Sequence, residues 1–130
     1  MIIIRRLKKS YGKTEALRGI DLDIHSGECF GLIGPNGAGK TTTLKVLASL
    51  VKPDFGVVII DNNDVVERPD LIRRTVGFMP DIFQCYGDTK ILHYLDYFGA
   101  LVGLRGRART RKVSQVLELT DLTPKRDELV

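Results

Sequence analysis

The chain has 130 residues, of which 43% are hydrophobic and 28% charged, and its formal net charge is +4. This balance is that of an ordinary globular protein and excludes a disordered polar tract. No apolar run approaches the roughly 20 residues that span a bilayer, and the opening run 2–4 stops at Arg5, so it is not a signal peptide. The two cysteines, Cys29 and Cys85, give no disulfide framework and no metal-ligand spacing.

Two strands are predicted ahead of a glycine-rich stretch. Over residues 20–24, isoleucine and leucine alternate with aspartate, which is the pattern of a half-buried strand. The apolar run 29–33 suits a strand buried on both faces, as in the centre of a parallel sheet. Its neighbours in such a sheet are expected to include strands beyond Val130.

A helix is predicted from about residue 40 to residue 50, ended by the break at residues 53–56. The side chains expected on its inward face are Leu44, Leu47 and Val51. Residues 57–60 form a predicted strand, which ends at a turn over 61–64. A short helix near 70–74 then leads into a strand over 75–79.

From residue 88 onward the pattern is helical. Thr89 is the predicted N-cap of a first helix, and a second helix is predicted over about 108–119. The inward side chains are expected to be Ile91, Leu95, Phe98 and Val102 in the first helix, and Val113, Val116 and Leu117 in the second. The chain therefore divides into a mixed α/β part, residues 1–80, and a helical part, residues 81–130.

Residues 34–41 match the phosphate-binding pattern G-x-x-x-x-G-K-[ST] in full. Glycine lets the backbone N–H groups turn toward a phosphate in conformations that a Cβ would obstruct. The helix that follows directs its N-terminal dipole at the same phosphate. Lys40 offers a cation to the β- and γ-phosphates, and the Thr41 hydroxyl suits Mg²⁺, which prefers oxygen ligands.

The stretch 27–43, Gly-Glu-Cys-Phe-Gly-Leu-Ile followed by Gly-Pro-Asn-Gly-Ala-Gly-Lys-Thr-Thr-Thr, closely resembles the nucleotide-binding subunits of ABC transporters. Residues 16–20 and 76–80 resemble two further strands of that family, the second entering its Q-loop. The resemblance covers essentially the whole chain. It implies an α/β fold, of the P-loop NTPase kind and ABC ATPase type, that stops within the helical subdomain, with 81–130 supplying the Q-loop and the start of that subdomain.

The resemblance also implies a site for ATP and Mg²⁺. Tyr11 stands where the family carries its adenine-stacking aromatic residue. Asp81 follows Pro80 where the family usually has glutamine. It could ligate Mg²⁺ or orient water, or it could be a solvated loop acid; Gln84 lies three residues too late. Lys40 and Asp81 are the candidate catalytic residues, and Thr41 and Asp81 the candidate metal ligands. The residues expected to hold the nucleotide are Tyr11, Gly34, Pro35, Asn36, Gly37, Ala38, Gly39, Lys40, Thr41 and Thr42.

Other parts of the family's catalytic inventory are not found. Residues 57–61 have the form of a Walker B strand, but they follow the phosphate loop too soon, and Asn62 stands where the catalytic glutamate would be, so Asp61 is rejected as a Mg²⁺ ligand. Neither His25 nor His93 is placed to be the switch histidine. With no signature segment either, the chain alone is expected to be inactive in ATP hydrolysis and poorly stable.

The function implied for the parent protein is that of the ATP-binding subunit of an ABC transporter, which couples ATP binding and hydrolysis to transport. Its partners would be integral-membrane permease subunits and a second ATPase subunit, at the cytoplasmic face of the membrane. The alternatives are a soluble ABC ATPase that acts on ribosomes or DNA, and a nucleotide-binding fragment without catalysis. No aromatic-rich basic surface is found, so nucleic acid is not expected. The basic stretch 105–112 is interpreted as a solvated helix entry, or as a contact for anionic headgroups.

Overall fold

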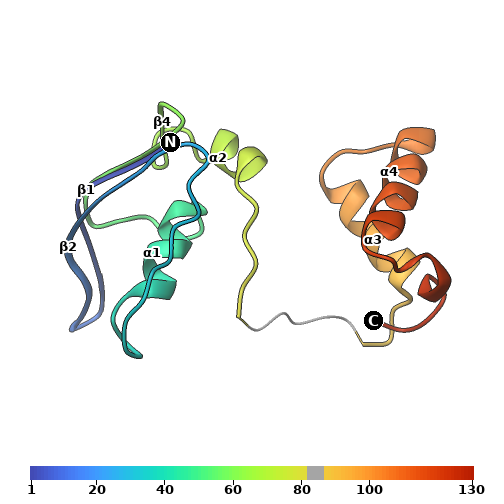
Figure 1. The fold of residues 1–130 in the computed structure, drawn as a ribbon, viewed down its shortest axis with the longest axis horizontal. Coiled ribbons are helices and arrows are strands. Elements are labelled where there is room, and N and C mark those ends of the chain that lie inside the picture. Colours follow the sequence, from blue (N-terminus) through green and yellow to red (C-terminus); the bar gives the residue numbers. More distant parts are fainter. Residues whose placement is uncertain (82–86) are drawn as a thin grey trace. The chain divides into compact units, whose positions relative to one another are not determined.

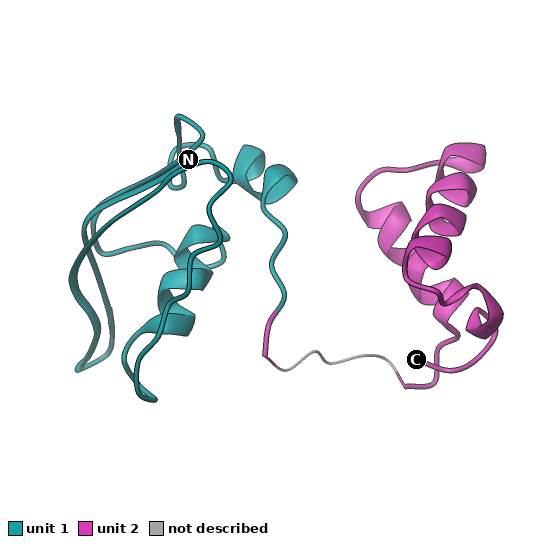
Figure 2. Cartoon of the chain, viewed as in Figure 1, with its two compact units in different colours: residues 1–79 teal, residues 80–130 magenta. Residues whose placement is uncertain are grey.

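A computed structural model describes residues 1–81 and 87–130, so Gln84 and Cys85 lie outside the described residues. The chain forms two compact units, residues 1–79 and residues 80–130 (Figure 2). Among the described residues, no helix has both the length and the apolar character that crossing a membrane requires.

The first unit is built on a four-stranded antiparallel sheet in the order β2-β1-β3-β4 (Figure 1). The central strand β1, Ile2–Tyr11, pairs with β2, Thr14–Ile24, on one side and with β3, Phe55–Ile60, on the other. The short strand β4, Asn63–Asp64, completes the sheet next to β3. This arrangement places the run 57–61 in an antiparallel hairpin.

Backbone geometry explains two irregular points of the sheet. Asp61 and Asn62, which join β3 to β4, have φ of 45° and 63°, the left-handed pair that a tight two-residue hairpin turn requires. Gly56 has a φ of +96°, and a Cβ there would lie 2.5 Å from the carbonyl oxygens of Arg5 and Arg6. This close approach occurs where the register between β1 and β3 shifts. Only glycine fits at position 56.

Helices α1, Lys40–Leu47, and α2, Pro69–Thr75, lie on one side of the sheet (Figure 1). The helix predicted over 40–50 thus ends three residues early. Its inward face was also partly mispredicted: Leu44 is 45% exposed, whereas Val46 is fully buried. Burying Val46 rather than Leu44 rotates the inward face of this short helix. The common core consists of Ile4, Leu7, Leu17, Val46, Val58, Ile60, Val65 and Ile72.

Two predicted strands are not formed. Residues 29–33 and 76–79 carry no regular secondary structure, and Ile33 is 96% exposed. An apolar run becomes a central strand only when other strands pair with it on both sides. The described residues supply no strand that pairs with either segment.

The second unit pairs helix α3, Ile91–Leu101, with helix α4, Gly106–Leu119, and ends with a short 3₁₀ turn, η1, over Thr123–Lys125. On α4 the inward face is as predicted, with Val113 and Leu117 buried and Val116 half-buried. On α3, Ile91 and Leu95 are half-buried, but the predicted inward residues Phe98 and Val102 are exposed.

The predicted N-cap of α3 is also wrong. Lys90 occupies the cap position, and it makes no side-chain hydrogen bond there. The first N–H groups of the helix, at Ile91 and Leu92, instead donate to the backbone carbonyls of Glu128 and Arg126 at 3.0 and 2.9 Å. The returning chain therefore satisfies donors that a capping side chain would otherwise satisfy.

Candidate phosphate-binding site

The glycine-rich loop, residues 34–39, connects the extended segment 29–33 to the first residue of α1. Gly37 and Gly39 have φ of 83° and 88°, which is the left-handed region that side chains rarely adopt. Gly39 has a second constraint, because a Cβ there would lie 2.5 Å from the Ala16 carbonyl oxygen and 2.5 Å from Leu17 Cδ2. Strand β2 therefore supports the end of the loop directly, and this contact leaves no room for a side chain.

Lys40 folds back over this loop. Its Nζ donates hydrogen bonds to the carbonyl oxygens of Gly34 at 2.6 Å and Pro35 at 2.8 Å. The backbone N–H of Ala38 donates to the Pro35 carbonyl at 3.2 Å, which closes the turn. The ammonium group is thus held against the loop by two neutral carbonyl oxygens. An anion in the loop would offer it a stronger, charge-assisted bond.

The first turn of α1 is fixed by Thr43, a residue to which sequence reasoning assigned no role. Its backbone N–H and its hydroxyl both donate to the Gly39 carbonyl, at 2.8 and 3.0 Å, and the residue is only 1% exposed. The signal in the sequence was a threonine four residues after Gly39, because a threonine hydroxyl in a helix can donate to the carbonyl four residues earlier. Thr41 is exposed and Thr42 is half-buried in the same turn.

A hollow of about 310 Å³ adjoins the loop. Strand β2 supplies most of its lining, including Glu15, Ala16 and Arg18, and the loop contributes Gly37 and Ala38. The Arg18 Nε lies 3.8 Å from Glu15 Oε2, and both side chains are largely exposed. The loop therefore has open space beside it, bounded by one cation and one carboxylate.

Tyr11 ends β1 at the tip of the β1–β2 hairpin, and it is 48% exposed. This tip and the phosphate loop lie at the same end of the first unit, the lower end in Figure 1. The Lys9 Nζ lies 5.7 Å from the centre of the Tyr11 ring and 2.7 Å from Asp54 Oδ1. The Lys9 cation thus lies over the ring of the exposed Tyr11, and the strand that carries the ring is tied to the segment before β3.

The pKa of the Asp54 carboxyl group is lowered by the hydrogen bonds that it accepts. The hydrogen bond from Lys9 lowers the pKa of Asp54 most, and a second hydrogen bond, from the backbone N–H of Ser10 at 2.7 Å, lowers it further. Both donors favour the ionised form. The hairpin is therefore fastened by a carboxylate whose charged form is favoured by both of its hydrogen bonds.

The remaining candidates lie elsewhere. Asp81 is exposed and belongs to the second unit. Asp61, which was rejected as a metal ligand, lies in the β3–β4 turn, where its Oδ1 is 2.6 Å from the amino group of Met1. Within the described residues no three His, Cys, Asp or Glu side chains form a metal-binding group. Near the loop, the hydroxyl of the exposed Thr41 is an oxygen of the kind that Mg²⁺ prefers.

Comparison with known proteins agrees with this geometry. The family model described as ABC transporter matches residues 17–130, and the chain belongs to this family. Among similar proteins, the Nod factor export ATP-binding protein I of Cupriavidus pinatubonensis is 38% identical over 92% of this chain and 37% of its own length. The probable multidrug ABC transporter ATP-binding protein YbhF of Escherichia coli is 36% identical over 91% of this chain and 20% of its length.

Solved structures give the same result for the fold. A dimeric ATP-binding cassette in a post-hydrolysis state, bound to ADP and Pi, matches 99% of this chain and 61% of its own with a TM-score of 0.81 and 25% identity. The predicted fold class, a P-loop NTPase of the ABC ATPase type, is thereby confirmed. The chain spans about a third or less of the two curated relatives described above.

Proposed function

We propose that this chain supplies the phosphate-binding part of the ATP-binding subunit of an ABC transporter, in which ATP binding and hydrolysis drive transport across a membrane. The observation that carries the proposal is the position of the Lys40 ammonium, held at 2.6 and 2.8 Å by the carbonyls of the loop that would enclose the phosphates. The names of the relatives, which include export and multidrug ATP-binding proteins, support the transport role.

The loop residues would divide the work of holding ATP. Lys40 would neutralise the β- and γ-phosphates, and the N-terminus of α1 would favour the same negative charge. Gly37 and Gly39 would let backbone N–H groups point inward. Tyr11 would stack on the adenine ring. The full set proposed to hold the nucleotide is Tyr11, Gly34, Pro35, Asn36, Gly37, Ala38, Gly39, Lys40, Thr41 and Thr42.

Thr41 and Asp81 are proposed to hold Mg²⁺, which supplies charge neutralisation on the phosphates when bound. Lys40 and Asp81 are the proposed catalytic residues. Asp81 is an acid where the family usually presents an amide, and either side chain offers an oxygen that can face metal or water. Asp81 belongs to the second unit, whereas Lys40 and Thr41 belong to the first.

The proposed partners are a second ATP-binding subunit and integral-membrane permease subunits, at the cytoplasmic face of the membrane. The dimeric state of a similar cassette supports the first partner. The transporter names of the relatives support the second. Nucleic acid is not among the proposed partners.

The test is titration of the intact protein with fluorescently labelled ATP, comparing Lys40→Ala with Lys45→Ala. Lys45 is an exposed lysine on the same helix, so it controls for the loss of charge. We expect Lys40→Ala to weaken binding by roughly 10- to 150-fold, since a charge-assisted hydrogen bond is worth roughly 1.5–3 kcal/mol. Lys45→Ala should bind as the wild type does. Equal affinity of all three proteins would remove Lys40 from the site.

A second measurement separates the transporter role from a nucleotide-binding role without catalysis. Phosphate release by the intact protein should depend on Mg²⁺ and should be lost in Lys40→Ala. Binding of ATP without any release of phosphate, even with the permease subunits present, would favour the binding role.

A further inference from the structure

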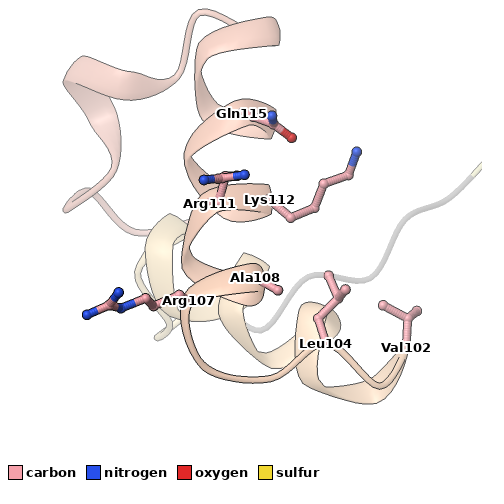
Figure 3. A pocket seen from close by; sticks show the side chains of 7 residues that line it. All are labelled: Val102, Leu104, Arg107, Ala108, Arg111, Lys112 and Gln115. Atoms are coloured by element: carbon pink, nitrogen blue, oxygen red, sulfur yellow. The ribbon is translucent and has the colours of Figure 1, made fainter.

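A second hollow, of about 630 Å³, lies on the outer face of α4 and is separate from the phosphate loop (Figure 3). Three of its lining residues, Val102, Leu104 and Ala108, are apolar. Three others, Arg107, Arg111 and Lys112, are basic, and no acidic residue lines it. The size is typical of ligand-binding hollows, and the lining combines apolar surface with positive charge.

The positive charge of this face is not neutralised within the described residues. Arg109, on the inward side of α4, pairs with Asp96 at 2.7 Å. Arg105, Arg107, Arg111 and Lys112 make no ion pair among the described residues. The first turn of α4 also contains no acidic residue. Cations near a helix N-terminus oppose the helix dipole, so an external anion would stabilise this end of α4.

Exposed apolar side chains border the same cations. Val102 is 75% exposed and Leu101 is 62% exposed at the end of α3. In Figure 3 the side chain of Lys112 extends on the same side of α4 as Val102 and Leu104. Long basic side chains beside exposed apolar ones are the composition of surfaces that lie at a lipid interface.

The directions of the cations distinguish between two anionic partners. In Figure 3 the Arg107 guanidinium points away from Val102 and Leu104, the Arg111 guanidinium lies across the front of the helix, and Lys112 extends to the other side. A single acidic side chain of a partner protein could meet only one of these groups. A layer of headgroup phosphates offers many anionic groups and could meet Arg111 and Lys112 together, whereas Arg107 points away from the apolar pair.

We propose that the outer face of α4, with its basic residues Arg111 and Lys112 and the apolar residues Val102 and Leu104, binds anionic phospholipid headgroups at a membrane surface. The phosphates face the cations, and the apolar pair contacts the glycerol and upper acyl region. This goes beyond the proposed nucleotide site, because it assigns a lipid contact to the ATP-binding subunit itself.

The test is co-sedimentation of the intact protein, without permease subunits, with vesicles of phosphatidylcholine alone or with phosphatidylglycerol added. We expect binding only to the second kind. Each basic residue near an anionic surface contributes about fivefold to binding, so R111Q/K112Q should weaken it about 25-fold. The matched control is K90Q/K125Q, which removes two exposed lysines of the same unit outside the hollow and should leave binding nearly unchanged.

Two further variants keep the test decisive. R111K/K112R preserves both charges and should bind as the wild type does, and V102S should weaken binding while preserving charge. Retained helical circular dichroism and retained ATP affinity show that each variant is folded and that the nucleotide site is separate.

Three outcomes would overturn the proposal. Equal losses of vesicle binding in R111Q/K112Q and K90Q/K125Q would show that binding depends on the net charge of the protein and not on the face of α4. Equal binding to vesicles without phosphatidylglycerol would show that the protein does not recognise an anionic headgroup. Release of the protein from vesicles by inorganic phosphate or polyglutamate, but not by chloride at the same ionic strength, would identify a site for a free anion or an acidic protein segment.

Discussion

Lys9 and Asp54 are joined by an ion pair of 2.7 Å that connects strand β1 to the segment just before β3. The second oxygen of Asp54 accepts a hydrogen bond from the Ser10 backbone at 2.7 Å, and the Asp54 N–H donates to the Lys8 carbonyl at 3.0 Å. The cation of this pair also lies over the ring of Tyr11. The Asp54 carboxylate thus links the end of strand β1 to the segment before β3 through both of its oxygens.

We expect Asp54→Asn to reduce stability slightly at neutral pH and to flatten its dependence on acid. The pKa of Asp54 is lowered in the folded protein. Its stabilisation is therefore fully present above the unfolded value, near 3.8, and is lost as the pH falls through the lower folded pKa. Denaturant melts at neutral pH and below pH 3.8 measure this effect. Glu67→Gln, at an exposed acid of the same unit, is the control and should retain the wild-type acid dependence.

Tyr11→Ala should weaken ATP more than it weakens inorganic triphosphate, because stacking acts on the base whereas the loop acts on phosphates. A loss of about 0.5–1.5 kcal/mol, or about 2- to 12-fold, is expected for ATP alone. Tyr11→Phe keeps the ring and should retain ATP affinity. Competition titrations with both ligands give the comparison, and equal losses for ATP and triphosphate would show that Tyr11 is a packing residue only.

Gly39→Ala and Gly37→Ala form a matched pair in the loop. Both glycines have positive φ, so both substitutions carry a backbone cost of about 1–2 kcal/mol. Only at Gly39 would the new Cβ meet the Ala16 carbonyl and Leu17 at 2.5 Å, whereas nothing lies within 4 Å at Gly37. We expect Gly39→Ala to lower the free energy of unfolding by about 1–3 kcal/mol more than Gly37→Ala does. Equal losses would contradict the close approach of β2.

Asp81→Ala in the intact protein should lower Mg²⁺-dependent turnover while leaving nucleotide binding nearly unchanged. An oxygen that positions metal or water affects the geometry of reaction, and misplacement of about 1 Å can cost about 100-fold. Asp88→Ala, at another exposed acid of the second unit, is the control. Single-turnover hydrolysis with saturating ATP measures the effect. Wild-type turnover in Asp81→Ala would mean that this residue is a solvated loop acid.

Features that depend on local sequence were predictable. The glycine-rich loop and the helix that begins at Lys40 follow from a contiguous pattern, and the tight turn at Asp61 and Asn62 follows from residues that tolerate positive φ. The inward face of α4 follows from helical periodicity, since Val113 and Leu117 recur four residues apart.

Features that depend on contacts between distant segments were not predictable. The contact of Gly39 with Ala16 and the ion pair between Lys9 and Asp54 each join different elements, and no periodicity encodes either contact. The strand predicted over 29–33 failed for a related reason. Apolar composition indicates burial, but a strand also needs a partner, and the described residues provide none.

The unpaired segment 29–33 leads directly into the phosphate loop, and this has a consequence for amide hydrogen exchange. Backbone N–H groups without a ladder partner exchange quickly with solvent, whereas those of a paired central strand exchange only through unfolding. The exchange rates of the amides of residues 29–33 therefore report whether this segment is paired with other strands. Their exchange should slow sharply once neighbouring strands pair with them, and the phosphate loop that they anchor should stiffen at the same moment.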